Sequence, residues 1–190
     1  MTPALAGVLV GGAGKRMGGL AKGLLRTANG ATIVERWRGV LERRGLGVVL
    51  VGAADGYAHL GIEMLADEPA GIGPLGGLVA LLRRAGGRPV LAVACDMQFV
   101  SEGLVERLVA SSPDAPILAP RRHGRWEPLF ARYDPARVLA LAVSRARSGK
   151  HSLQGLLDES AAVELRLARP EEGELHDWDA PSDISSESAV

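Results

Sequence analysis

A glycine-rich segment near the amino terminus holds the residues of this chain best suited to bind phosphate. It reads Gly11-Gly12-Ala13-Gly14-Lys15-Arg16-Met17-Gly18-Gly19, and Lys22 follows closely. Glycines let backbone N–H groups approach and turn toward an anion, and Arg16 and Lys22 supply positive charge for phosphate oxygens. The same glycines would also suit a plain connection that needs them only for its turn. We favour phosphate binding because the glycines and basic residues occur together, directly after an apolar run.

Two common phosphate-binding motifs do not fit this segment. The P-loop requires a lysine followed by serine or threonine, whereas Lys15 is followed by Arg16. The dinucleotide-binding fingerprint requires a glycine at position 17, which is Met17 here. The sequence therefore argues against a kinase-type NTPase and against a nicotinamide-dependent dehydrogenase.

Two aspartates follow other apolar runs. Asp96 comes just after Val90–Ala94, and a carboxylate there can hold Mg²⁺, which prefers one or two carboxylates together with substrate phosphates. Its alternative role is to shape the turn or cap the helix that begins near Ser101. Asp67 follows Ile62–Ala66, where it could accept hydrogen bonds from a base or ribose, or only shape the next loop.

Other catalytic patterns are absent from the sequence. The 4 histidines have no metal-ligand spacing, and no Gly-x-Ser-x-Gly nucleophile elbow occurs. The single cysteine, Cys95, excludes an internal disulfide. We expect it to be a small core residue beside the site.

Alternating strands and helices would bring the phosphate segment and the two aspartates together. The predicted strands are Ala4–Val10, Val48–Val51, Ile62–Ala66, Val90–Ala94, Ile117–Ala119, Leu129–Tyr133 and, at an edge, Val163–Leu167. The predicted helices begin at Thr32, Pro74, Ser101, Asp134 and Ser152. This alternation predicts a three-layer α/β fold, with a mostly parallel sheet and helices on both faces. Ligands of such sheets bind beyond the carboxyl ends of the strands, where all three features fall.

The composition suits one globular domain over residues 1–190, with a short polar tail at about 185–190. The 22 basic residues balance 22 acidic ones, which argues against a nucleic-acid partner. We expect the pair Arg43-Arg44 to lie on a solvated face. No run reaches the roughly 18 apolar residues of a membrane helix, and the first apolar run precedes its basic residues, unlike a signal peptide. These features predict a cytoplasmic protein that does not associate with membranes.

The motifs resemble those of the molybdenum cofactor guanylyltransferase family over nearly the whole chain. The run from Leu9 to Gly19, continued by Lys22-Gly23-Leu24-Leu25, resembles the nucleotide loop of that family. The other similar segments, in the same order, are Asp67 with Gly71–Gly77, Cys95–Val100, Trp126–Ala131 and Asp179–Pro181. The first motif and the one around Asp96 are specific, and the others are supportive. The resemblance implies a Rossmann-like nucleotidyltransferase fold.

The resemblance also implies an activity. The terminal phosphate of molybdopterin, with or without molybdenum, would attack the α-phosphate of GTP, accept GMP and release pyrophosphate. Further implied partners are molybdoenzyme chaperones or molybdenum-insertion proteins. A cytidylyltransferase or other cofactor or sugar nucleotidyltransferase of the same fold remains an alternative, although the pair Gly11-Gly12 resembles the guanine-specific relatives. A non-catalytic carrier of GTP or molybdopterin is another.

Site residues follow from the resemblance, position by position. Backbone groups would contact the guanine and ribose at Leu9, Val10, Gly11 and Gly12, and Gly14 would also lie in the nucleotide site. The implied catalytic residues are Arg16 and Lys22, which would neutralise the triphosphate, and Asp96, which would bind the Mg²⁺ cofactor. Asp67 would touch the nucleoside. The segment Arg145–Gln154, with Arg147, Lys150 and Ser152, is a hypothesis for the acceptor phosphate.

Three positions depart from the family pattern. Ala21 stands where an aspartate usually precedes the lysine matched by Lys22. Gly52 stands where an asparagine near the base is expected, and Asp179 replaces the asparagine of the closing motif. These departures put full catalytic competence in question.

Overall fold

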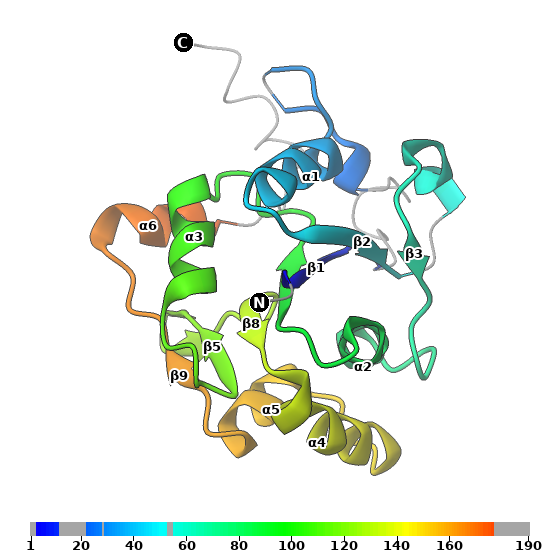
Figure 1. Ribbon diagram of the computed structural model, residues 1–190, viewed down its shortest axis with the longest axis vertical. Helices are drawn as coiled ribbons and strands as arrows, with labels where there is room; N and C mark the ends of the chain where they lie inside the picture. The colour runs from blue at the N-terminus through cyan, green and yellow to red at the C-terminus, as the bar shows by residue number, and fades with distance from the viewer. Residues whose placement is uncertain (1–2, 12–21, 28, 53–54, 177–190) are drawn as a thin grey trace.

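The computed structural model describes residues 3–11, 22–27, 29–52 and 55–176, and a seven-stranded sheet forms its middle layer (Figure 1). The strand order is β3-β2-β1-β4-β8-β5-β9. Their bounds are β1 Leu5–Leu9, β2 Gly47–Val51, β3 Met64–Leu65, β4 Val90–Ala94, β5 Ile117–Ala119, β8 Phe130–Tyr133 and β9 Val163–Glu164. Strands β1 to β4 are parallel, and β8 runs antiparallel to its neighbours β4 and β5. The predicted mostly parallel sheet is confirmed, with β8 reversed.

Helices cover both faces of the sheet, as predicted (Figure 1). On one face lie α1 (Ile33–Arg43) and α3 (Glu102–Ala110), with α6 (Arg169–Glu174) beside α3; on the other lie α2 (Pro74–Ala85), α4 (Pro135–Arg147) and α5 (Leu153–Glu159). Alternate side chains of each strand feed two separate cores. On β1, Ala6 and Val8 join the core under α1, whereas Leu5 and Leu9 join the core under α2.

The five predicted helices begin at the residues that the sequence indicates. Side-chain oxygens of Thr32, Ser101, Asp134 and Ser152 accept first-turn N–H groups of α1, α3, α4 and α5. Helix α2 instead begins with Pro74 and ends at Gly86, whose φ of 59° lies in the left-handed region.

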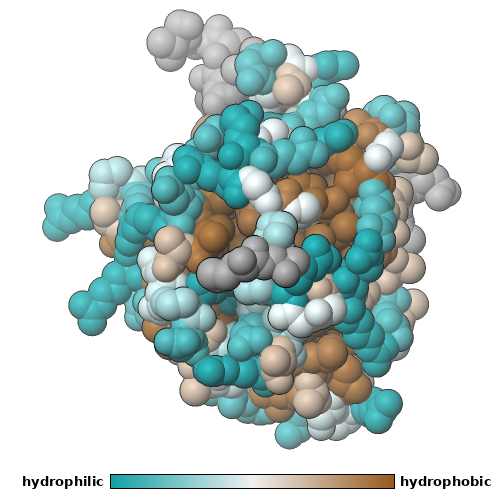
Figure 2. Space-filling view, viewed as in Figure 1, coloured by the Kyte–Doolittle hydropathy of each residue, from teal (hydrophilic) through white to brown (hydrophobic). Residues whose placement is uncertain are grey.

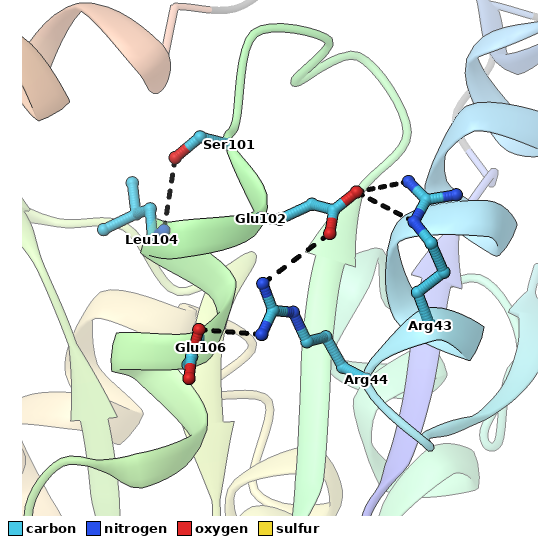
Figure 3. Close-up of polar contacts among 6 residues, drawn as sticks. All are labelled: Arg43, Arg44, Ser101, Glu102, Leu104 and Glu106. Carbon is cyan, nitrogen blue, oxygen red and sulfur yellow. Dashed lines mark hydrogen bonds and ion pairs between the residues drawn. The ribbon is translucent and has the colours of Figure 1, made fainter.

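Ion pairs join the end of α1 to the start of α3 (Figure 3). Arg43 Nε donates to Glu102 Oε1 at 2.9 Å, and Arg44 Nη1 donates to Glu106 Oε2 at 2.7 Å. Both arginines are exposed, as predicted for this pair. Because such exposed pairs contribute about 0–1 kcal/mol each, they align the two helices rather than hold the fold together.

The surface is polar over most of the face shown in Figure 2, with hydrophobic side chains visible between the polar ones. Among the described residues, the exposed large hydrophobic side chains are Phe99 at 42% and Val163 at 39% exposure. None of the described helices is long and apolar enough to cross a membrane.

Several elements were not predicted. They are the hairpin of β6 (Arg121–Arg122) and β7 (Arg125–Trp126), the short helix α6, and the 3₁₀ turns η2 (Lys22–Leu24) and η3 (Asp55–Leu60). The predicted strands Ile62–Ala66 and Val163–Leu167 shrink to the two-residue strands β3 and β9. The predicted polar tail and Asp179 lie outside the described residues.

Candidate active site

The carboxyl ends of β1, β2, β3 and β4 meet at one edge of the sheet because these strands are parallel. Backbone bonds continue past the strand ends: the N–H groups of Val10 and Gly11 both point to the Val51 carbonyl, at 2.9 and 3.3 Å. The Cys95 N–H donates to the Leu9 carbonyl at 3.2 Å. Leu9, Val10 and Gly11, all predicted nucleotide contacts, therefore lie on a fixed backbone. The predicted site residues Gly12, Gly14 and Arg16 lie outside the described residues.

Gly11 and Gly52 meet backbone to backbone at this edge. A Cβ atom on Gly52 would lie 2.6 Å from the Gly11 Cα, and Gly52 has a φ of 108°. Both the space and the backbone conformation therefore require glycine. The departure from the family's asparagine at this position has a local structural cause, since no side chain fits on this backbone.

Lys22 and Asp96, predicted from separate motifs, lie together in the structure. The Lys22 Nζ lies 3.2 Å from the Asp96 Oδ2, and the two side chains are 25% and 21% exposed. Asp96 follows β4, and Lys22 begins η2, the turn that leads into α1. This pair places one cation and one carboxylate at the carboxyl end of a central strand, within reach of solvent.

A buried tyrosine holds the turn that carries Lys22. The Gly23 N–H donates to the Tyr57 hydroxyl at 3.1 Å, and Tyr57 is fully buried. Tyr57 belongs to η3, which follows β2. Sequence reasoning missed this residue because a lone tyrosine 34 positions from its partner in the chain carries no recognisable motif.

Cys95 lies beside this pair but is not a nucleophile. It is 7% exposed, and burial, with the neighbouring Asp96 charge, raises the pKa of its thiol to about 12. The thiol is therefore protonated at neutral pH, whereas a cysteine nucleophile acts as the thiolate. The expectation that Cys95 is a small core residue is confirmed.

Asp67 is a half-buried carboxylate at the end of β3. Among the described residues, no hydrogen bond or ion pair reaches its side chain, and burial raises its pKa. A Cβ atom on Gly77 would lie 3.1 Å from the Asp67 Oδ1, so Asp67 sits directly against the first turns of α2. Carboxylates desolvated without a cation are unfavourable for stability and are enriched at functional sites.

The glycines at the start of α2 serve packing. A Cβ atom on Gly76 would lie 2.4 Å from the Pro69 carbonyl oxygen, and one on Gly77 would lie 2.7 Å from the Val51 Cγ1. The segment that resembles a family motif thus lets α2 approach both the Asp67 loop and β2. Close packing alone explains these glycines.

Asp96 could hold a metal ion together with phosphate groups of the substrate. Within the part of the chain that the structure describes, no group of three or more His, Cys, Asp or Glu side chains could hold a metal. Mg²⁺ fits one carboxylate when phosphate oxygens and water complete its shell. The partly exposed Asp96 carboxylate meets that requirement.

The segment proposed for the acceptor phosphate divides into structural and exposed residues. Arg145 is 5% exposed, pairs with Glu159 and donates to the Ser152 carbonyl at 3.1 Å. The Ser152 hydroxyl caps α5. These two residues join α4 to α5, whereas Arg147 and Lys150 are exposed and remain able to meet an anion.

The β6–β7 hairpin is attached to α5 beside this segment. The Gln154 side chain accepts from the Trp126 N–H at 3.1 Å and donates to the Trp126 carbonyl at 2.7 Å. The indole N–H donates to Asp158 at 2.9 Å, and the Arg121 guanidinium lies 3.8 Å from the centre of the Trp126 ring. These contacts fix the hairpin against α5.

Most of this chain matches the model of a known family. Residues 6–163 match the model of the MobA-like NTP transferase domain. The chain belongs to this family. As a MobA-like protein it is a nucleotidyltransferase, as the motifs around Leu9 and Asp96 predict.

Similar proteins cover almost the whole of this MobA-like chain. A molybdenum cofactor guanylyltransferase of Pseudomonas putida is 33% identical over 169 residues, which are 85% of each chain. A probable molybdenum cofactor guanylyltransferase of Opitutus terrae is 34% identical over 97% of this chain and 95% of its own length. The crystal structure of molybdopterin-guanine dinucleotide biosynthesis protein A from Archaeoglobus fulgidus has a TM-score of 0.75 at 24% identity, covering 95% of both chains. That structure confirms the fold.

Proposed function

We propose that this chain transfers GMP from GTP to the terminal phosphate of molybdopterin and releases pyrophosphate. The observation that carries the proposal is the meeting of Lys22 and Asp96, 3.2 Å apart, at the edge where the backbone of β1 emerges. Relatives that are 33–34% identical over 85–97% of the chain carry the name molybdenum cofactor guanylyltransferase. These names support guanine as the base and the molybdenum cofactor as the acceptor in the proposed reaction.

The charged residues of the edge have roles in the proposed reaction. An oxygen of the acceptor phosphate attacks the α-phosphorus of GTP, a new P–O bond forms, and the bond to the β-phosphate breaks. The Lys22 ammonium stabilises the negative charge on the triphosphate, and the Asp67 carboxylate accepts a hydrogen bond from the nucleoside. The buried Cys95 thiol takes no part, and the proposed transfer depends on positioning and charge.

Asp96 is the residue that would hold Mg²⁺. When bound, the ion supplies charge neutralisation between the phosphate groups. Asp96 also lies against Lys22, so its carboxylate orients the ammonium group before the nucleotide arrives. The Asp96 carboxylate could therefore interact both with the Lys22 ammonium and with the Mg²⁺ that accompanies the nucleotide.

Pyrophosphate release tests this proposal. The purified chain is incubated with molybdopterin, Mg²⁺ and either GTP, CTP or ATP, and pyrophosphate is measured over time. Release with GTP and molybdopterin together, and not with either alone, supports the proposal. Faster release with CTP replaces it with a cytidylyltransferase, and tight GTP binding without release replaces it with a carrier.

A further inference from the structure

We propose that Tyr57 is a positioning residue for Lys22, whose hydroxyl fixes the turn that aims the lysine at the nucleotide phosphates. This inference rests on the proposed phosphate role of Lys22. It does not depend on which base or which acceptor the enzyme takes. The motifs that the sequence analysis singles out do not include Tyr57.

A series of successive contacts links the turn after β2 to Asp96. Tyr57 lies in η3, which follows β2, and its hydroxyl accepts the Gly23 N–H at 3.1 Å. Gly23 is the next residue after Lys22, whose Nζ lies 3.2 Å from the Asp96 Oδ2. The Leu25 N–H donates to the Lys22 carbonyl at 3.1 Å and closes the turn. The direction of the lysine side chain therefore depends on how Gly23 is held.

Gly23 is tightly seated on Tyr57. A Cβ atom on Gly23 would lie 2.8 Å from the Tyr57 hydroxyl oxygen and 2.6 Å from the Val34 Cγ2. Only glycine lets the turn approach this closely, and the hydroxyl satisfies a buried N–H that would otherwise lack a partner at this point. The turn is thus located by a hydrogen bond and not only by apolar contact.

The hydroxyl is a neutral group at physiological pH. Burial, with a smaller contribution from the adjacent Cys95, raises the pKa of Tyr57 to about 12. Tyr57 is therefore protonated near neutral pH, and its hydroxyl oxygen accepts the Gly23 N–H as a neutral group.

Tyr57→Phe isolates this hydrogen bond, and the chain contains a matched control. Tyr133 is the second tyrosine; it is equally buried, and its hydroxyl donates to the Pro128 carbonyl at 2.6 Å. Tyr133 packs in the core on the opposite face of the sheet from Tyr57. Tyr133→Phe therefore removes a comparable buried hydrogen bond without touching the turn at Lys22.

The experiment is a double-mutant cycle read out by nucleotide affinity. Dissociation constants for GTP and CTP with Mg²⁺ are measured by calorimetry for the wild type, Tyr57→Phe, Lys22→Ala, the double variant and Tyr133→Phe. We expect Tyr57→Phe to weaken binding of the preferred nucleotide about tenfold, the equivalent of about 1.4 kcal/mol. In the Lys22→Ala background the same change should weaken binding less than about twofold, because interacting residues are not additive. Tyr133→Phe should leave binding within about twofold while losing similar thermal stability.

The outcomes separate this inference from the proposed function. Equal losses of affinity in both backgrounds would mean that Tyr57 acts on binding by another route, and the inference would be wrong. Wild-type affinity in Tyr57→Phe would overturn it as well. A wild-type protein that binds nucleotide and shows the expected cycle, but releases no pyrophosphate, would leave the inference standing and refute only the proposed function.

Discussion

Asp96→Asn is the substitution that most directly tests the site. It keeps the size of the side chain and removes its charge, so the carboxylate can no longer balance Lys22 or hold Mg²⁺. The two side chains are 25% and 21% exposed, and their closest atoms are 3.2 Å apart. Partly exposed pairs of this kind contribute at most about 1 kcal/mol to folding. For a chain of this size that corresponds to a fall of about 2–4 °C in the thermal midpoint.

Turnover should change far more than stability. Loss of one preorganised charged group at a reacting centre lowers kcat by about 10²–10³-fold. We therefore expect at least a roughly hundredfold loss of Mg²⁺-dependent pyrophosphate release for Asp96→Asn. The assay is initial-rate pyrophosphate release at saturating GTP and molybdopterin, with Mg²⁺ varied, alongside thermal unfolding of the same samples.

Glu63→Gln is the matched control for charge removal. Glu63 accepts two hydrogen bonds from Arg84, at 2.7 and 2.8 Å, at the amino end of β3 and away from the site. It should lose a similar or smaller amount of stability and keep full turnover. If Asp96→Asn retained wild-type turnover at every Mg²⁺ concentration, Asp96 would be neither the metal ligand nor the partner that orients Lys22.

Three further predictions concern residues around the site. Gly52→Asn should destabilise the protein by about 1–3 kcal/mol in urea unfolding, because the side chain meets the Gly11 backbone at a positive φ; an unchanged urea midpoint would refute the close approach. Burial raises the Asp67 pKa above its ordinary 3.8, so the folded protein binds that proton more tightly than the unfolded chain and stability falls as the pH rises through this interval. Asp67→Asn should lack that decrease in midpoints measured from pH 3 to 7, and a parallel pH profile would contradict the assignment. Trp126→Phe loses the 2.9 Å bond to Asp158 and should lower stability by about 1 kcal/mol in thermal unfolding, with nucleotide affinity unchanged.

The sequence predicts most of the fold because its local signals are strong. Capping residues such as Thr32 and Ser101 define helix starts through bonds to their own first turns. The apolar run Val90–Ala94 forms a strand because it is buried on both faces. In contrast, the reversed direction of β8 depends on its pairing with β4 and β5, and an apolar run does not specify which way its strand runs.

The sequence predicts the site residues that follow parallel strands, because the ends of these strands meet at one edge of the sheet. It misses residues whose role depends on a contact with a distant part of the chain. Parallel strands place Asp96 at the same edge as the chain that follows β1, so the sequence could bring it near Lys22. Tyr57 acts through a backbone N–H, which leaves no trace in residue type. Arg145 lies in a basic segment that suggests an anion site. In the structure its side chain is buried and pairs with Glu159, which links α4 to α5.

The late position of β8 in the sequence also has a consequence while the protein is being made. Strands β1 to β4 and their helices are complete once residue 110 has left the ribosome, but the outer edge of β4 is then unpaired. An open edge on a fully apolar strand is a template for aggregation. It is closed only when Phe130–Tyr133 arrives and pairs with Val90–Val93. We therefore expect the nascent chain to be most prone to aggregation while the stretch between α3 and β8 is being synthesised.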